Sequence, residues 1–192
     1  MPGAAGVDLA AARQTLVGEL REHALIVGEV TLSSGRRADY YVDARRALLR
    51  PAGFLAAGEL IAAVAVERGA DAVGGPVMAA IPLACAAIAV PAGAGLRGFF
   101  VRQERKQHGL QRWVEGPVEA GARCLVVEDT VTTGGSTVAA IERIREQGLG
   151  IVGARAVVDR LAGGGEAVAA AAEAPFSALA TIDDVYPDRP DR

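Results

Sequence analysis

The chain has 192 residues, a length that suits one ordinary domain with small additions. Hydrophobic residues make up 51% of it and aromatic residues only 4%, so Ala, Val, Leu and Ile must build the core, as in helices packed on a parallel sheet. The formal net charge of -3 excludes a broad electrostatic surface for nucleic acid or for an anionic membrane.

The first part of the chain is predicted to form a helix and a flap. From Asp8 to about Gly28, apolar residues recur at helical spacing, which favours an amphipathic helix. Val30–Leu32 and Tyr40–Val42 are predicted to be short strands, because the turn-forming run Ser33–Gly35 lies between them. Residues 1–8 lack the basic start and apolar core of a signal peptide. We therefore expect a helix followed by a hairpin beside the core.

The middle of the chain alternates predicted helices and strands, which implies βαβ units and a parallel sheet. The apolar stretch 79–92 is shorter than the roughly 20 residues that a membrane-spanning helix needs, so it is expected to be a buried helix. The expected elements are a helix at about 52–68, a strand at 71–75, a helix at 79–90, strands at 98–101 and 124–127, a helix at 136–147 and a strand at 151–158.

The last part of the chain gives weaker signals. A Gly163–Gly165 turn and an Ala-rich stretch follow the strand at 151–158, and the tail 183–192 is expected to fray or to join the flap in a small hood. Cys85 and Cys124 both lie in apolar runs, which favours reduced core thiols over a disulfide or a metal site. Reduced thiols predict a cytoplasmic location.

The segment Cys124–Thr137 combines an apolar strand, two acids, a glycine-containing loop and a helix start. Ligands bind at the carboxyl ends of strands in an open α/β sheet. Glu128 and Asp129 would repel a phosphate, so they are expected to face sugar hydroxyls or a hydrated Mg2+. The segment predicts a phosphorylated-sugar site, with an Asp-Thr helix cap as the alternative. The loop residues able to turn N–H groups and hydroxyls toward one phosphate are Thr132, Thr133, Gly134, Gly135 and Ser136.

This segment resembles the signature of the type I phosphoribosyltransferases, in which a strand, two acids and a Thr-rich loop hold phosphoribosyl diphosphate. The resemblance implies an α/β fold with a parallel core sheet flanked by helices and a small hood from the N-terminal flap. It implies that Glu128, Asp129, Thr130 and the loop bind phosphoribosyl diphosphate, with Asp129 also catalytic and Mg2+ held near the two acids through the diphosphate and waters. Residues 1–192 are then a single domain, with the helix and flap over about 1–45 and the core over about 50–182.

The stretch Val30–Asp43 is similar to the flap that orotate phosphoribosyltransferases place over the pyrimidine. Tyr40 and Tyr41 are expected to wall the flat ring of orotate, with Thr132 as a further contact. Arg160, at a strand end, matches the family's arginine that pairs with the orotate carboxylate or carbonyl. The alternatives are a half-buried hairpin and a surface ion pair.

The stretch Arg102–Arg112 is similar to the mobile catalytic loop of the same family, which closes over the active site of the neighbouring subunit. A homodimer is therefore implied. Displacing diphosphate leaves negative charge on the leaving group, so Arg102, Lys106 and His108 are expected to be catalytic and, with Gln103, to bind the diphosphate. His108 could also donate a proton. A solvated charged loop is the alternative.

The run Gly74–Ala79 occupies the place of the family's diphosphate loop, where glycines let backbone amides reach the ligand. The family often has Lys where this chain has Ser33, Ala79 and Gln103, so the site lacks some expected cations. The predicted reaction transfers the 5-phosphoribosyl group from phosphoribosyl diphosphate to orotate. A phosphoribosyltransferase for another base, or a non-catalytic regulator that senses phosphoribosyl diphosphate, remains an alternative.

Overall fold

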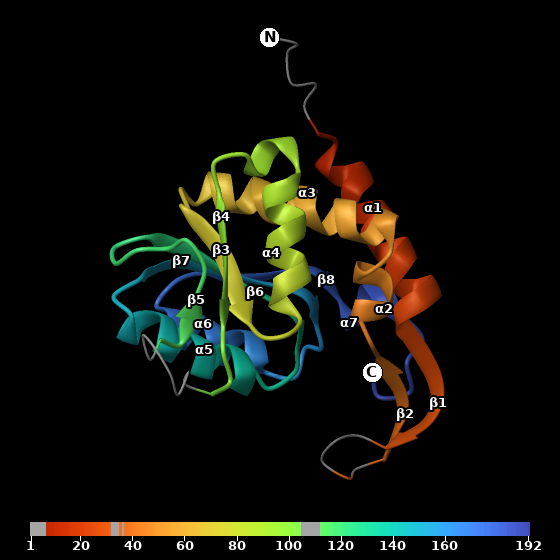
Figure 1. Ribbon diagram of the computed structural model, residues 1–192. Helices are drawn as coiled ribbons and strands as arrows, with labels where there is room; N and C mark the ends of the chain where they lie inside the picture. The colour runs from red at the N-terminus through yellow and green to blue at the C-terminus, as the bar shows by residue number, and fades with distance from the viewer. Residues whose placement is uncertain (1–6, 32–34, 36, 105–111) are drawn as a thin grey trace.

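The computed structural model describes residues 7–31, 35, 37–104 and 112–192. Within them, the core is a six-stranded sheet in the order β5-β4-β3-β6-β7-β8, which is parallel except that β5 runs antiparallel to β4 (Figure 1). The predicted parallel core sheet is confirmed. The strands are β3 (Ala72–Pro76), β4 (Arg97–Val101), β5 (Val114–Glu115), β6 (Arg123–Val131), β7 (Gly150–Asp159) and β8 (Phe176–Thr181).

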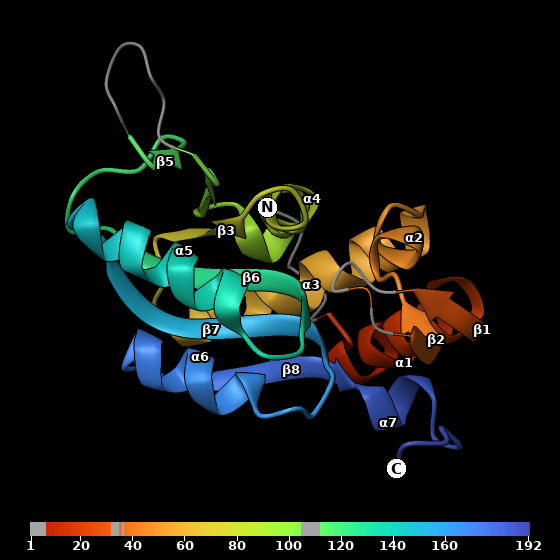
Figure 2. The same ribbon diagram turned by 90° about the horizontal axis from the view of Figure 1, so that it is seen from below.

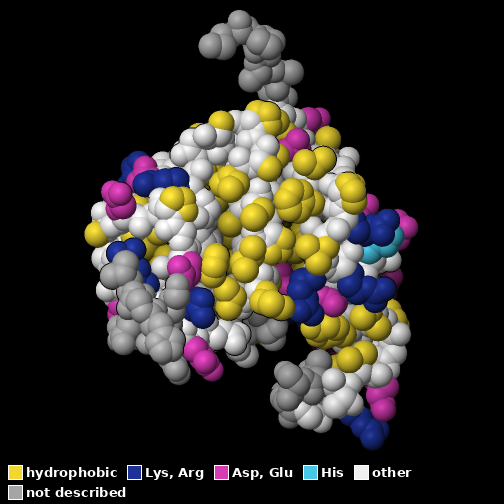
Figure 3. All heavy atoms as spheres, viewed as in Figure 1, with side chains coloured by type: hydrophobic (Ala, Val, Ile, Leu, Met, Phe, Trp, Pro, Cys, Tyr) yellow, Lys and Arg dark blue, Asp and Glu magenta, His cyan; other side chains and the backbone are white. Residues whose placement is uncertain are grey.

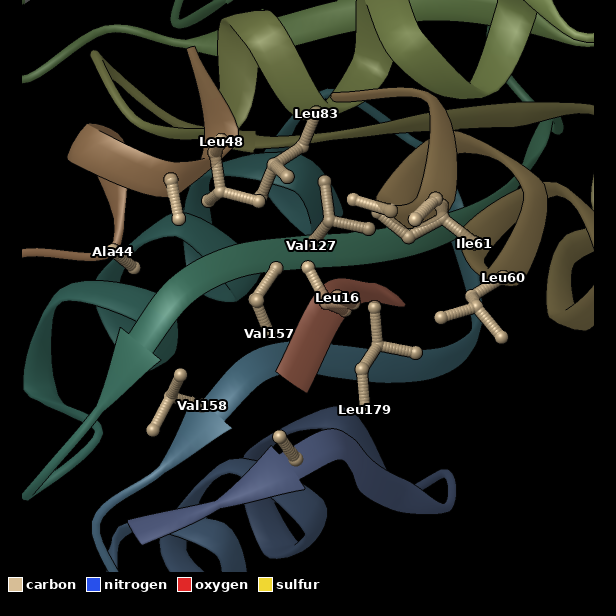
Figure 4. Close-up of a cluster of buried hydrophobic side chains, with 14 of the residues drawn as sticks. Leu16, Ala44, Leu48, Leu60, Ile61, Leu83, Val127, Val157, Val158 and Leu179 are labelled. Atoms are coloured by element: carbon tan, nitrogen blue, oxygen red, sulfur yellow. The ribbon is translucent and has the colours of Figure 1, made fainter. Parts of the chain in front are cut away.

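Helices cover both faces of this sheet. Consecutive residues of its central strands are apolar and point to opposite sides, so both faces are apolar. Leu125 and Val127 of β6 pack with α1, α3 and α4, and Figure 4 shows Val127 among side chains of these helices. Cys124 and Val126 pack instead with α5 and α6, which lie side by side in Figure 2. The main helices are α1 (Leu9–Glu19), α3 (Pro51–Glu67), α4 (Ala80–Ala89), α5 (Gly135–Glu146) and α6 (Gly164–Ala172), with short helices at α2 (Arg45–Leu48) and α7 (Ile182–Val185).

A separate antiparallel hairpin of β1 (Leu25–Thr31) and β2 (Arg37–Val42) projects from the core and forms the predicted hood (Figure 1). The opening helix is capped by the Asp8 carboxylate, which accepts hydrogen bonds from two backbone N–H groups at 3.0 Å. Its helical part ends at Ala24 through a π-helical turn, so the prediction of a helix to about Gly28 was wrong at this end. The longer β1 can pair with β2 along both tyrosines, including Val27 opposite Tyr40.

The chain reverses its direction of winding between β3 and β6. β3 leads through α4 to β4 on one side, whereas β6 leads through α5 to β7 on the other. β3 pairs with β6 only from Ala72 to Gly74, so the end of β6 continues beside β7 alone. Such a reversal leaves a crevice at the carboxyl ends of the two strands, and ligands bind there in open α/β sheets.

The apolar sequence of α4 predicted a helix buried on all sides, but one of its faces is exposed. Ile81 and Ile88 are 36% and 38% exposed, and Cys85 between them is an exposed free thiol, so the prediction that Cys85 lies in the core was wrong. Apolar side chains gather on this face of the molecule (Figure 3). Cys124 is buried as predicted, and burial raises the pKa of its thiol to about 12. Among the described residues, no helix is both long and apolar enough to cross a membrane.

The C-terminal part forms further regular elements, and its tail contacts the hood instead of extending away from the core. α6 and β8 follow the Gly163–Gly165 turn, and β8 adds a parallel strand beside β7. Thr181 then caps α7, since its hydroxyl accepts from the Asp184 N–H while the Asp184 carboxylate accepts from the Thr181 N–H at 2.8 Å. The tail beyond Val185 returns to the hood.

Candidate active site

A cavity of about 610 Å³ opens at the crevice between β3 and β6. Its walls come from the end of β2, the β3–α4 loop, the end of β6 and the residue that follows β7. The cavity thus joins segments that are more than 100 residues apart in the chain. The lining residues are Tyr41, Val42, Asp43, Arg45, Val77, Met78, Ala79, Gln103, Asp129, Thr130, Thr132 and Arg160.

The two acids of the sequence motif lie within β6 and have different surroundings. Glu128 is buried, and its Oε2 accepts hydrogen bonds from the Ser136 and Thr137 hydroxyls, each at 3.3 Å. Burial, together with the neighbouring Asp129, raises the pKa of Glu128 to about 8. Asp129 lines the cavity; burial raises its pKa, and the Arg45 guanidinium opposes that rise. Asp129 is therefore the acid that can meet a ligand directly.

The predicted phosphate loop connects β6 to α5. Thr132 lines the cavity, and Gly134 has a left-handed φ of 80° where it begins the helix. A Cβ at Gly134 would lie 2.8 Å from the Gly164 carbonyl oxygen, so a side chain does not fit there. The first N–H groups of α5 precede the first helical bond, from Val138 N–H to the Gly134 carbonyl, and are free of partners within the helix. The loop carries Thr133, Gly135 and Ser136 as exposed residues.

The two tyrosines of the hood point in different directions, because neighbouring residues of a strand face opposite sides. Tyr41 lines the cavity. Tyr40 is not among the lining residues: it is 4% exposed, and its ring forms a T-shaped contact with Tyr186 of the tail, with ring centres 5.3 Å apart. In this arrangement Tyr41 is the tyrosine able to wall a flat ring.

Arg160 follows the carboxyl end of β7 and lines the cavity next to the hood. Its backbone N–H donates to the Val131 carbonyl at 2.9 Å, and its guanidinium carbon lies 4.9 Å from the centre of the Tyr40 ring. The Asp159 carboxylate does not form an ion pair with Arg160 in the described structure. Its Oδ1 accepts a hydrogen bond from the Leu161 N–H at 2.8 Å. The cavity thus has a cationic fork at one end.

A second cation in the lining was not identified from the sequence. Arg45 donates through Nε to Asp43 at 2.8 Å, and that hydrogen bond and charge raise the pKa of the Arg45 guanidinium. Asp43 follows β2 and Arg45 begins α2, and both line the cavity. An acid and a base two residues apart after a tyrosine-rich strand are the signal that could have indicated them.

The segment after β4 is only partly described. Gln103 lines the cavity, while Arg102 borders an adjoining hollow, its Nη1 3.7 Å from the Glu115 carboxylate. The Arg102 carbonyl accepts from Arg143 at 2.8 Å, which holds the start of this segment to α5. Lys106 and His108 lie outside the described residues, so their predicted roles stay predictions.

The glycines of the predicted diphosphate loop belong to β3. A Cβ would lie 2.1 Å from the Phe99 carbonyl oxygen at Gly74 and 2.1 Å from the Val127 carbonyl oxygen at Gly75. They are therefore needed for the close approach of β4 and β6 rather than for ligand access. Val77 and Met78, joined by a cis peptide bond, are the parts of the run that reach the cavity with Ala79.

The described residues contain no group of three His, Cys, Asp or Glu side chains placed to hold a metal ion. Both carboxylate oxygens of Glu128 accept hydrogen bonds from hydroxyl or backbone donors. Asp129 Oδ1 accepts from the Thr130 N–H at 2.7 Å. One carboxylate facing a polar cavity fits a magnesium ion that takes its other ligands from substrate oxygens and water.

The fold and this cavity define a class of protein, the phosphoribosyltransferases. Residues 46–174 match the phosphoribosyl transferase domain family. An orotate phosphoribosyltransferase of Corynebacterium glutamicum is 43% identical over 176 residues, which span 92% of this chain and 95% of that protein. The chain belongs to the orotate phosphoribosyltransferase family, and the resemblance seen in its motifs is confirmed.

Solved structures agree with this assignment. An orotate phosphoribosyltransferase of Mycobacterium tuberculosis H37Rv in complex with Fe(III) dicitrate has a TM-score of 0.82 and 38% identity over 91% of this chain and 98% of its own. The same enzyme in complex with 5-phospho-alpha-D-ribosyl 1-diphosphate has a TM-score of 0.78 and 34% identity over the same shares. The type I phosphoribosyltransferase fold predicted from the sequence is thereby confirmed.

Proposed function

We propose that the protein transfers the 5-phosphoribosyl group from phosphoribosyl diphosphate to orotate, giving orotidine 5'-phosphate and diphosphate. The observation that carries this proposal is the single cavity that brings Asp129, Thr132 and Arg160 together in a chain of this family. The cavity has a loop for a phosphate, an acid for a sugar and a cation for an acidic base. Both cysteines are free thiols, which supports a cytoplasmic location for the reaction.

The 5-phosphate is assigned to the β6–α5 loop. The first N–H groups of α5 point out of the helix end, where the helix dipole favours an anion. Hydroxyl groups of Thr132, Thr133 and Ser136 and the backbone of Gly134 and Gly135 add donors and room. The buried Glu128 carboxylate accepts hydrogen bonds from the Ser136 and Thr137 hydroxyls and so stabilises the loop.

The ribose is assigned to the end of β6. Asp129 and Thr130 line the cavity and directly precede the phosphate loop in the chain, so the sugar is assigned to the space beside them. The Asp129 carboxylate can accept from the ribose hydroxyls and stabilise positive charge that develops on the sugar. A hydrated Mg2+ on the diphosphate would reduce the charge of the leaving group.

Orotate is assigned to the space between the hood and Arg160. Tyr41 offers an aromatic wall, and the Arg160 guanidinium can bind the carboxylate of the base with two N–H groups. N1 of orotate is an anion after it loses its proton, so placement and charge neutralisation are the main tasks of the site. The diphosphate is assigned to Gln103, Arg102 and the residues Lys106 and His108 of the same segment.

A homodimer is part of the proposal, because the family's loop acts on the neighbouring subunit. An exposed apolar strip supports it (Figure 3), formed by Met78 just before α4 and by Ile81, Cys85 and Ile88 of α4. The strip begins at Met78 in the cavity lining, so a second copy seated on it would lie beside the active site.

The direct test follows the loss of orotate absorbance after orotate, phosphoribosyl diphosphate and Mg2+ are added to the protein. Uracil, adenine and hypoxanthine serve as parallel acceptors, with diphosphate release as the common readout. We expect diphosphate release with orotate alone. Release with another base would identify a different acceptor, whereas tight binding of phosphoribosyl diphosphate without release from any base would favour the sensing regulator. Asp129→Asn is the inactive control.

A further inference from the structure

The end of the chain is fastened to the hood through Tyr40. The Tyr40 hydroxyl donates to the Asp191 carboxylate, whose two oxygens both lie 3.1 Å away, and the Tyr40 ring meets Tyr186 at an interplanar angle of 79°. Asp191 is held in turn by Arg189 Nε at 3.1 Å, and Arg189 also pairs with Asp183. The tail therefore contacts both the aromatic ring and the hydroxyl group of the buried Tyr40.

The same ring carries the Arg160 guanidinium on its face, 4.9 Å from its centre. The face of an aromatic ring attracts a cation, and this attraction grows when water is excluded. Arg160 Nε is buried without a hydrogen-bond partner in the described structure, so the ring is the contact that orients this part of the side chain. Arg160 also lines the cavity.

We propose that Tyr40, Tyr186 and Asp191 form a tail clamp that positions Arg160 for the carboxylate of the base. Tyr40 is then a positioning residue that acts through Arg160, without touching the substrate. An arginine side chain loses considerable rotamer freedom when it is fixed, and a clamp that fixes it beforehand improves binding. This inference rests on the proposed function, which assigns the acidic base to Arg160.

Graded variants test the clamp through the KM for each substrate. Tyr40→Leu removes the ring and is expected to raise the KM for orotate about tenfold, with the KM for phosphoribosyl diphosphate within about twofold of wild type. Tyr40→Phe keeps the ring but loses the hydroxyl, and Asp191→Ala loses the acceptor, so each should raise the KM for orotate about threefold. The double variant of these two should match either single variant, because both remove the same bond.

A double-mutant cycle with Arg160→Ala separates positioning from a general structural effect. If Tyr40 acts through Arg160, Tyr40→Leu should change orotate binding by less than about twofold once Arg160 is Ala. A full tenfold loss in that background would overturn the proposal, as would equal losses in the KM for both substrates. Glu29→Gln, which breaks an exposed pair with Arg37 on the same hairpin, is the matched control and should leave both KM values unchanged.

Failure of the clamp can be told apart from failure of the proposed function. If the wild-type protein consumes orotate but the double-mutant cycle shows that Tyr40 and Arg160 act independently, the clamp is rejected and the proposed reaction stands. If the wild-type protein uses another acidic base, the assignment of orotate is wrong, and the same double-mutant cycle is then measured with that base. Thermal unfolding of every variant identifies any that fail to fold, and Tyr40→Phe keeps the test available if Tyr40→Leu is one of them.

Discussion

Glu128 and Asp129 are neighbouring carboxyl groups with different tasks. Because β6 continues through both, one side chain points into the protein beneath α5 and the other toward the cavity. The inward acid is held by two hydroxyl groups and by the backbone N–H of Asp129. Its buried position favours the neutral form, so Glu128 behaves as a structural brace whose charge is costly.

The raised pKa of Glu128 predicts how its replacement changes stability with pH. A carboxyl group whose folded pKa lies near 8 rather than 4.5 favours folding fully below pH 4.5, and this contribution is lost as pH rises toward 8. Glu128→Gln, which stays neutral, should therefore gain up to about 4 kcal/mol over wild type between pH 5 and pH 9. Urea unfolding at the two pH values measures the gain. An equal difference between the proteins at both values would contradict it.

Tyr40 and Tyr41 show what sequence can and cannot reveal about individual side chains. The pattern placed both on a short strand near the base site, and the strand is confirmed. Alternation on a strand already allowed only one of the pair to face the cavity, and the other, Tyr40, contacts a tail about 150 residues later in the chain. Asp191 and Tyr186 carry no local signal for such a contact.

The elements of the core were largely predictable, because their apolar runs are bounded by glycines and charges. α3 and β3 begin and end within two residues of their predicted bounds, and so does α5. β8 was not predicted, since Ser, Ala and Thr fill most of its six residues and it becomes a strand through pairing with β7. β6 runs four residues beyond its apolar stretch for the same reason, with β7 as its partner.

The close packing of β3 predicts a steep cost for one added methyl group. Gly74→Ala would place a Cβ 2.1 Å from the Phe99 carbonyl oxygen, so β3 and β4 would have to separate. We expect the free energy of unfolding to fall by about 3 kcal/mol. Gly98→Ala on β4 is the matched control, because its nearest neighbours are side-chain atoms at 3.5 and 3.8 Å, and it should cost under about 1 kcal/mol. Similar losses from both substitutions would refute the packing argument.

At the scale of the whole molecule, the exposed strip of α4 is the feature that the sequence misrepresented. A helix that is apolar all round suggested burial within the chain, whereas one face is covered by β3, β4 and α3 and the other is open. The sequence contains no signal that distinguishes burial within one subunit from burial between two.

The proposed dimer predicts that charge on the strip separates the subunits. Ile88→Glu places a carboxylate on the apolar strip, so sedimentation should show a shift from dimer to monomer. Activity should fall with dissociation, because the loop of one subunit would no longer reach the site of the other. Leu161→Glu, at an exposed apolar residue away from α4, is the control. A wild-type protein that sediments as a monomer would contradict the proposal.

Sharing of the loop between subunits predicts complementation. Lys106→Ala and Asp129→Asn each inactivate the dimer, but in a mixed dimer the intact loop of the second protein can serve the intact cavity of the first. Equal amounts, unfolded and refolded together, should recover about a quarter of wild-type activity, since half of the dimers are mixed and each has one complete site. A loop that serves its own subunit would recover none.

The division of the cavity between two parts of the fold also has an evolutionary consequence. The end assigned to the phosphate is built on β6 and α5, in the middle of the sheet, whereas the end proposed for the base depends on the hood, Arg160 and a tail that lies outside the sheet. Mutations that change which base is accepted can therefore accumulate in the hood and the tail while the sugar-phosphate loop is inherited unchanged. Descendants of such a chain would diverge first at their two ends.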